Sequence, residues 1–138
     1  MASLIYNSCI DYVCKGSIDF DTDTFKMMLV TSSYTPSKSH DFRDDVTDEV
    51  TGTGYTTGGN AATPTVTKDN TNNRVDISWT ITSWTSSTIT ARAGVIYKSR
   101  GGASSADELV GYVDFGSDVS SSSGTFSVTI TSPLRFQN

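Results

Sequence analysis

Alternation of apolar and polar residues dominates the chain from residue 73 onward. Residues 73–81 place every second side chain on one apolar face, formed by Val75, Ile77, Trp79 and Ile81. Residues 88–98 repeat the pattern with Ile89, Ala91, Ala93, Val95 and Tyr97. Two shorter runs, 109–115 and 126–130, continue it with Leu109, Val113, Phe115, Phe126, Val128 and Ile130. A period of two predicts antiparallel strands with one face in water.

Residues 24–34, "TFKMMLVTSSY", differ because they are apolar on both faces. This predicts a central strand, buried on both sides, that ends before Pro36. Residues 63–68, "TPTVTK", predict a weaker strand at a sheet edge, since Pro64 has no N–H for a ladder. The C-terminal "PLRFQN" is a second short edge candidate.

The N-terminal segment follows a helical period instead. Ile5, Cys9, Tyr12 and Val13 fall on one helix face. Ser3 is the expected N-cap, and Gly16 lies where a left-handed terminator belongs. On such a helix Cys9 and Cys14 point about 140° apart, so free thiols are expected rather than a disulfide or a zinc site.

Together these elements predict a single domain over residues 1–138. Residues 1–16 form a helical segment, and residues 17–138 form an antiparallel β-sandwich of jelly-roll or immunoglobulin-like type. A long polar loop, residues 35–62, interrupts the sandwich.

Charge and composition narrow the function. The formal net charge is −5 and charged residues make up 18% of the chain, so a nucleic-acid partner, which needs a basic face, is not expected. The N-terminus lacks the basic and apolar regions of a signal peptide. No apolar run approaches the length of a membrane span, so no membrane partner is expected either. We expect a protein that is made and kept in the cytoplasm, or one that leaves the cell without a classical signal.

Two acidic stretches are candidates for chemistry. "DFDTDTF" spaces Asp19, Asp21 and Asp23 like the start of a calcium loop, but Thr24 and Val30 occupy the glycine and glutamate positions of that motif. These aspartates are therefore weak metal candidates, and a solvated strand entry is the favoured reading.

The second stretch is "SHDFRDDVTDEVTGTGYTTGG", residues 39–59, which contains the sole histidine, His40. A histidine beside Asp41, Asp44 and Asp45 is a weak metal signal. Asp41 could instead cap a helical turn, with Arg43 pairing a neighbouring carboxylate at the surface. "GTGYTTG" fails the dinucleotide pattern at its third glycine, so its glycines predict turns with positive φ. We assign no catalytic and no cofactor-binding residues here.

The same stretches carry a resemblance. "DTDTFKMMLV", "YTPSKSHDFRDDV", "EVTGTGYTTGG", "AGVIYK" and "YVDFG" resemble a family of small virion proteins of tailed bacteriophages, over nearly the whole chain. The resemblance implies a structural component of a phage particle, located in the virion after assembly in the host bacterial cytoplasm. No catalytic residues are carried over from the family.

Three functions follow as hypotheses. The first is a non-enzymatic capsid decoration, or cement, protein that binds the major capsid protein on the outer shell. The second is a tail, baseplate or head-fibre component. The third is an enzyme, such as a metal-dependent glycan hydrolase, which would require paired carboxylates across a cleft.

For assembly, the apolar Leu4, Ile5 and Tyr6 exceed what one short helix can bury. This predicts a homo-oligomer, with a trimer favoured and the N-terminal segment in or beside the interface. Loops 35–59 and 99–107 are the other expected contact surfaces, with interface candidates Phe42, Arg43 and Tyr55.

Overall fold

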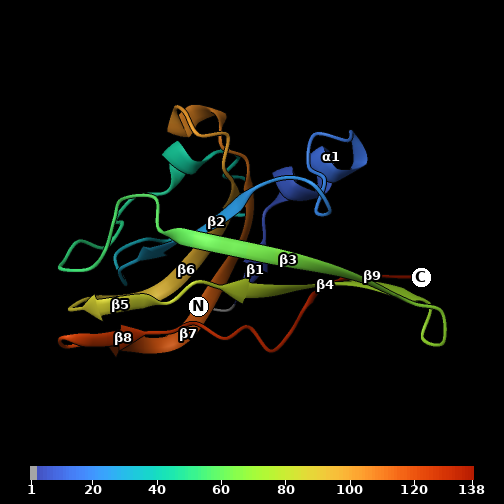
Figure 1. Ribbon diagram of the computed structural model, residues 1–138. Helices are drawn as coiled ribbons and strands as arrows, with labels where there is room; N and C mark the ends of the chain where they lie inside the picture. Colours follow the sequence, from blue (N-terminus) through green and yellow to red (C-terminus); the bar gives the residue numbers. More distant parts are fainter. Residues whose placement is uncertain (1–2) are drawn as a thin grey trace.

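The computed structural model describes residues 3–138 and is mainly β, with 47% of residues in strands and 10% in helices. This confirms the predicted fold class. A curled antiparallel sheet of seven strands forms the body (Figure 1). Its spatial order is β1 (Leu4–Ile5), β7 (Leu109–Ser120), β6 (Thr90–Lys98), β2 (Phe25–Val30), β3 (Asn60–Asp69), β4 (Arg74–Ile81) and β9 (Leu134–Gln137).

A two-stranded ribbon extends this sheet. β5 (Trp84–Ser87) pairs with β8 (Gly124–Phe126) at the lower left of Figure 1. β5 follows β4 in the chain, and a bridge between Thr80 and Thr129 links the two pairings. Residues 124–137 therefore run antiparallel along residues 74–87, from β8 to β9. A short turn, 121–123, joins this ribbon to the end of β7.

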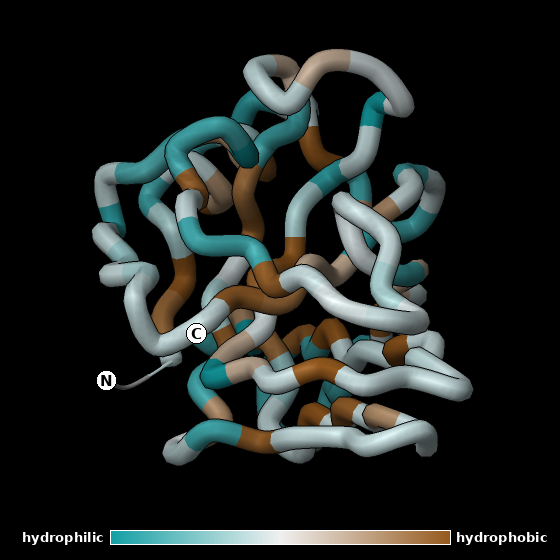
Figure 2. The backbone as a smooth tube through the Cα atoms, turned by 90° about the vertical axis from the view of Figure 1, so that its left-hand side faces the viewer, coloured by the Kyte–Doolittle hydropathy of each residue, from teal (hydrophilic) through white to brown (hydrophobic). Residues whose placement is uncertain are grey.

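The core consists of two apolar clusters on opposite faces of β2. Phe25, Met27 and Leu29 belong to the larger cluster, whereas Met28 and Val30 belong to the smaller one. Figure 2 shows the hydrophobic stretches gathered in the middle of the molecule, with the loops mostly hydrophilic or neutral. The predicted two-sided burial of this strand is confirmed, because both of its faces are covered.

The predictions of a single apolar face on β6 and on β7 are wrong, because β-bulges shift the pairing of these two strands. In β6, Ala91 belongs to the larger cluster, whereas Ala93, Val95 and Tyr97 belong to the smaller one. The register against β7 shifts between Ala91 and Ala93, and again between Ile96 and Tyr97. Since an extra residue reverses the alternation, Leu109 and Val113 also face different clusters.

The edge predictions hold in part. β9 is an edge strand, as expected for "PLRFQN". β3 lies inside the sheet order, which corrects the edge assignment of 63–68. However, β2 pairs with β3 only from Asn60 to Ala62 among the described residues, so Pro64 lies where β3 has β4 as its sole neighbour. The proline is tolerated there for the predicted reason.

The N-terminal helix begins later than predicted. Residues Leu4–Ile5 form β1, and helix α1 spans Asn7–Cys14 with Tyr6 as its N-cap residue. Ser3 does not cap the helix: its Oγ accepts a hydrogen bond from the amide of Asp114 at 2.9 Å. Gly16 follows the helix with φ of 76°, as predicted. Cys9 is buried and Cys14 exposed, and both thiols are free.

The longest loops gather at one end of the sheet. The loop between β2 and β3 contains the 3-10 turn η1 (Arg43–Asp45), and the loop between β6 and β7 contains η2 (Ser104–Ala106). Both turns lie at the top of Figure 1. We call this the loop end.

Candidate functional site

The glycine-rich stretch at the loop end is pinned by one carboxylate. Glu49 Oε1 accepts hydrogen bonds from the Tyr55 hydroxyl and the Gly58 amide, each at 2.6 Å. The Tyr55 hydroxyl in turn accepts the amide of Leu29 at 3.0 Å. Burial, followed by the bond to Glu49, raises the pKa of Tyr55, so the phenol remains protonated and acts as a structural donor.

The glycines have the predicted backbone role. Gly52, Gly54, Gly58 and Gly59 all have positive φ. A Cβ on Gly59 would lie 1.8 Å from the Met27 carbonyl oxygen, so the loop can approach β2 closely because the residue is glycine. These glycines thus shape a turn that packs directly against β2.

Arg43 does not pair with a neighbouring carboxylate, which corrects the prediction. Its Nε donates to Asp107 Oδ2 at 2.8 Å, and the Asp107 side chain is 2% exposed. Asp107 also accepts the amide of Arg100 at 2.9 Å. The Arg43 guanidinium lies 5.1 Å above the ring of Tyr97, and burial raises the pKa of Tyr97 to about 12. This ion pair ties the two long loops together.

Asp45, rather than Asp41, caps the η1 turn. Its carboxylate accepts the amides of Asp41 and Phe42 at 2.8 and 3.2 Å. These two bonds lower the pKa of Asp45. Asp41 and Asp44 are exposed.

His40 joins a chain of phenols. Its Nδ1 lies 2.9 Å from the Tyr34 hydroxyl, which lies 3.0 Å from the Tyr6 hydroxyl. Within residues 3–138, no group of three or more His, Cys, Asp and Glu side chains is placed to hold a metal ion.

The three spaced aspartates fold into a turn. Asp23 Oδ2 accepts the Asp19 amide at 2.8 Å, and Asp19 Oδ1 accepts the Asp21 amide at 2.9 Å. Asp23 also pairs with Lys98 Nζ at 2.8 Å. Burial is the largest single effect on Asp23 and acts to raise its pKa, but the bonds to Lys98 and the Asp19 amide, with the nearby charges of Lys98 and Arg100, outweigh burial and lower the pKa. Two of the three carboxylates thus serve the turn itself.

The six interface candidates differ in accessibility. Tyr6 is fully buried within the chain, which leaves its side chain unavailable for a contact. Tyr55 and Arg43 are half-buried and committed to Glu49 and Asp107. Phe42 is half-buried against Tyr12, with ring centroids 6.0 Å apart. Leu4 is half-buried and Ile5 is 37% exposed.

Ile5 borders a feature that sequence reasoning missed, an open groove along one side of the sheet. The groove separates β1 and the outer edge of β7 from residues 126–134, and we call it the seam. It comprises two adjoining hollows of about 460 and 540 Å³ that share Ser3, Val113, Ile130 and Ser132. The turn 121–123 closes the sheet beyond one end of the seam.

The seam is mainly apolar. The hollow nearer α1 is lined by residues of both outer strands of the sheet, Leu4 and Ile5 of β1 and Leu134 of β9, and by Trp79 and Val113. Ile10 of α1, which is 51% exposed, stands at its rim. Large apolar side chains thus reach solvent along this groove.

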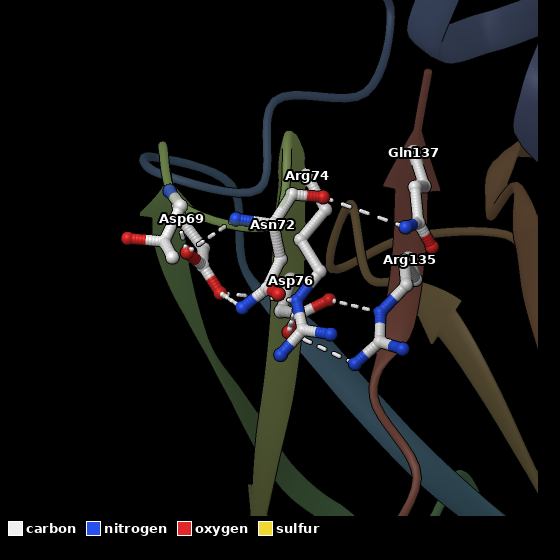
Figure 3. A network of polar contacts seen from close by, with 7 residues as sticks. Asp69, Asn72, Arg74, Asp76, Arg135 and Gln137 are labelled. Carbon is white, nitrogen blue, oxygen red and sulfur yellow. Dashed lines mark hydrogen bonds and ion pairs between the residues drawn. The ribbon is translucent and has the colours of Figure 1, made fainter.

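A polar network holds the β9 wall in place. Figure 3 shows Arg135 of β9 facing Asp76 of β4, with Nε and Nη2 donating to the two carboxylate oxygens at 2.7 and 3.1 Å. Arg74 Nε lies 3.2 Å from the same carboxylate and 3.3 Å from Asp69. The hydrogen bond from Arg135 lowers the pKa of Asp76.

Comparison of the chain with protein-family models, curated proteins and solved structures gives no match. The phage resemblance therefore stays a prediction. Across residues 3–138, none of the helices has the length and apolar character needed to cross a bilayer.

Proposed function

We propose that this chain is a non-enzymatic structural protein of a tailed-phage particle, and that it decorates the outer shell by binding the major capsid protein. The observation that carries the proposal is a contrast within one small domain. The loop end, where an active site would be expected, has its buried acidic groups bonded internally. Among residues 3–138, three of the five large apolar side chains most exposed to solvent, Ile5, Ile10 and Val119, lie instead beside the seam.

Two further features support the proposal. The motifs of residues 20–59 and 93–116 resemble those of small virion proteins. The net charge of −5 suits a protein that faces solvent rather than packaged DNA. Binding through many copies also allows a modest contact per copy, because repetition on a symmetric particle multiplies weak contacts.

The proposal includes self-association as a homotrimer. With Tyr6 buried inside the chain, the exposed Ile5 and Ile10 become the side chains that would contact another copy. Light scattering of the purified protein tests this, with Ile5→Asp as the disrupting variant. A strict monomer at high micromolar concentration, unchanged by the substitution, would contradict the trimer.

The direct test of the proposed function is a count of this chain in purified virions of the phage that encodes it. Quantitative mass spectrometry against the major capsid protein should give hundreds of copies per particle. A handful to a few dozen copies would move the protein to the tail, the baseplate or a head fibre. Absence from virions would reject a structural role on the particle.

A further inference from the structure

We propose that the seam binds an extended segment of a partner chain, with apolar side chains along its length and a carboxylate at the end beside Lys38. The inference goes beyond the proposed function, because it concerns the purified chain and holds whether or not the partner is a capsid protein.

The walls of the seam favour an extended occupant. Among the described residues, β1 pairs with β7 at two positions, Gly111 and Tyr112. The next outward amide of β7, that of Asp114, bonds to the Ser3 hydroxyl instead of a strand. Across the seam, the chain between β8 and β9 has one isolated bridge, at Thr129, on its β4 side. Unpaired strand edges are templates for an added strand.

The floor of the seam favours apolar side chains on that occupant. Val113, Ile130 and Leu134 are half-buried and pack against the larger core cluster. Because alternate side chains of a strand point to the same side, every second residue of an added strand would cover this floor. Burial of that surface supplies the main driving force.

The charged residues of the seam indicate where the occupant should carry a carboxylate. Lys38 is the one charged residue lining the hollow near α1, and its amine has no ion-pair partner among residues 3–138. Asp114, the one charged residue among the described residues lining the other hollow, is already bonded to Arg92 at 3.1 Å and to the Gly116 amide at 3.0 Å. A carboxylate near Lys38 therefore complements a charge of the seam that has no ion-pair partner among residues 3–138.

A second copy of this chain fits the floor of the seam less well, and the self-association proposed above uses the exposed Ile5 and Ile10 at the rim rather than that floor. The β7 edge carries Asp114 and Asp118. Pairing this edge with the same edge of a second copy would bring like carboxylates together, which opposes that pairing.

The test uses two synthetic heptapeptides, acetyl-SVTVSID-amide and acetyl-SVTVSIK-amide, titrated into isotope-labelled protein and followed by amide NMR shifts. The acid-ended peptide should shift amides in 110–116 and 127–134 and bind about tenfold more tightly than the lysine-ended peptide. Lys38→Glu should reverse that preference. Lys68→Glu is the matched control, since Lys68 is an exposed lysine of β3 outside the seam; it should behave like the parent protein.

Three results would overturn the inference. The first is no seam shift with either peptide at about 2 mM, near the weakest binding that such a titration detects. The second is equal binding of both peptides, unaffected by Lys38→Glu. The third is a set of shifts in residues 127–134 that depend on protein concentration alone, which would assign the floor of the seam to self-association. None of these results bears on copy number in virions, so failure here and failure of the proposed function are distinguishable.

Discussion

The loop end and the seam are built from the same sheet but close it in opposite ways. At the loop end, side chains from distant segments satisfy one another: Arg43 reaches Asp107 across 64 positions, and Glu49 holds Tyr55 and Gly58. At the seam, two strand edges diverge and leave apolar side chains between them. A cluster of acidic, histidine and glycine residues can therefore be structural, while apolar side chains that reach solvent lie in another part of the molecule, along the seam.

The largest expected effect comes from breaking the ion pair between the loops. Arg43→Ala leaves the Asp107 carboxylate buried without its guanidinium, and removal of one partner of a buried pair costs about 3 kcal/mol of unfolding free energy. Arg135→Ala removes an exposed arginine from an ion pair and should cost below about 1 kcal/mol. Urea unfolding of both variants measures the difference. Equal losses would mean that the loop end is not held by its buried polar contacts.

Removal of the Tyr55 hydroxyl should cause the second-largest loss of unfolding free energy. Tyr55→Phe leaves the Leu29 amide and the Glu49 carboxylate short of a partner inside the protein, which should lower the unfolding free energy by about 2 kcal/mol. Tyr12→Phe is the control, because no hydrogen bond of the Tyr12 hydroxyl is found among residues 3–138; it should change stability by less than about 0.5 kcal/mol. If Tyr55→Phe left the unfolding free energy unchanged, the hydrogen bonds of Tyr55 with Glu49 and Leu29 would not stabilise the loop end.

Acid should weaken the η1 turn through Asp45. Because its pKa is lower in the folded than in the unfolded chain, Asp45 adds stability above the ordinary aspartate range, and this contribution is lost as pH falls through the lowered value. Asp45→Asn should therefore be less stable than the parent at neutral pH, and the gap should narrow on acidification. Asp44→Asn, which alters an exposed carboxylate with no hydrogen bond among residues 3–138, should track the parent throughout. If the stability difference between Asp45→Asn and the parent widened at low pH, the pKa of Asp45 would be raised in the folded protein and not lowered.

The smallest effect is expected at the seam rim. Ile10 is 51% exposed, so Ile10→Thr should change the unfolding free energy by less than about 0.5 kcal/mol. Ile77→Thr, at a position 2% exposed in the larger cluster, should cost about 2 kcal/mol, since it replaces a buried ethyl group by a hydroxyl. If Ile10→Thr lowered the unfolding free energy as much as Ile77→Thr, the side chain of Ile10 would be packed in the core and not exposed at the rim of the seam.

Sequence patterns predict those parts of the fold that local periodicity determines. The two-sided run of β2, the alternation of β4 and the terminator Gly16 all lie as expected. The faces of β6 and β7 do not, because bulges near Arg92 and Val110 shift the register in a way that a period of two does not encode. β5 was missed because "WTSS" is polar, although both of its ends are buried.

The candidate sites show the same limit. Positive φ at the glycines of residues 52–59 follows from residue type, and the structure confirms it. The pairing of Arg43 with Asp107 and the seam both depend on which distant segments meet. A single sequence leaves that choice open, since several neighbouring carboxylates were equally suitable partners for Arg43.

Native-state hydrogen exchange tests the contrast between the two regions most directly. The amides of Leu29 and Gly58, which donate to Tyr55 and Glu49, should exchange as slowly as the core strands. Most amides between β8 and β9, in residues 127–133, should exchange many times faster, because few of them have partners among residues 3–138. Fast exchange at Leu29 and Gly58 together with protection across 127–133 would contradict the account.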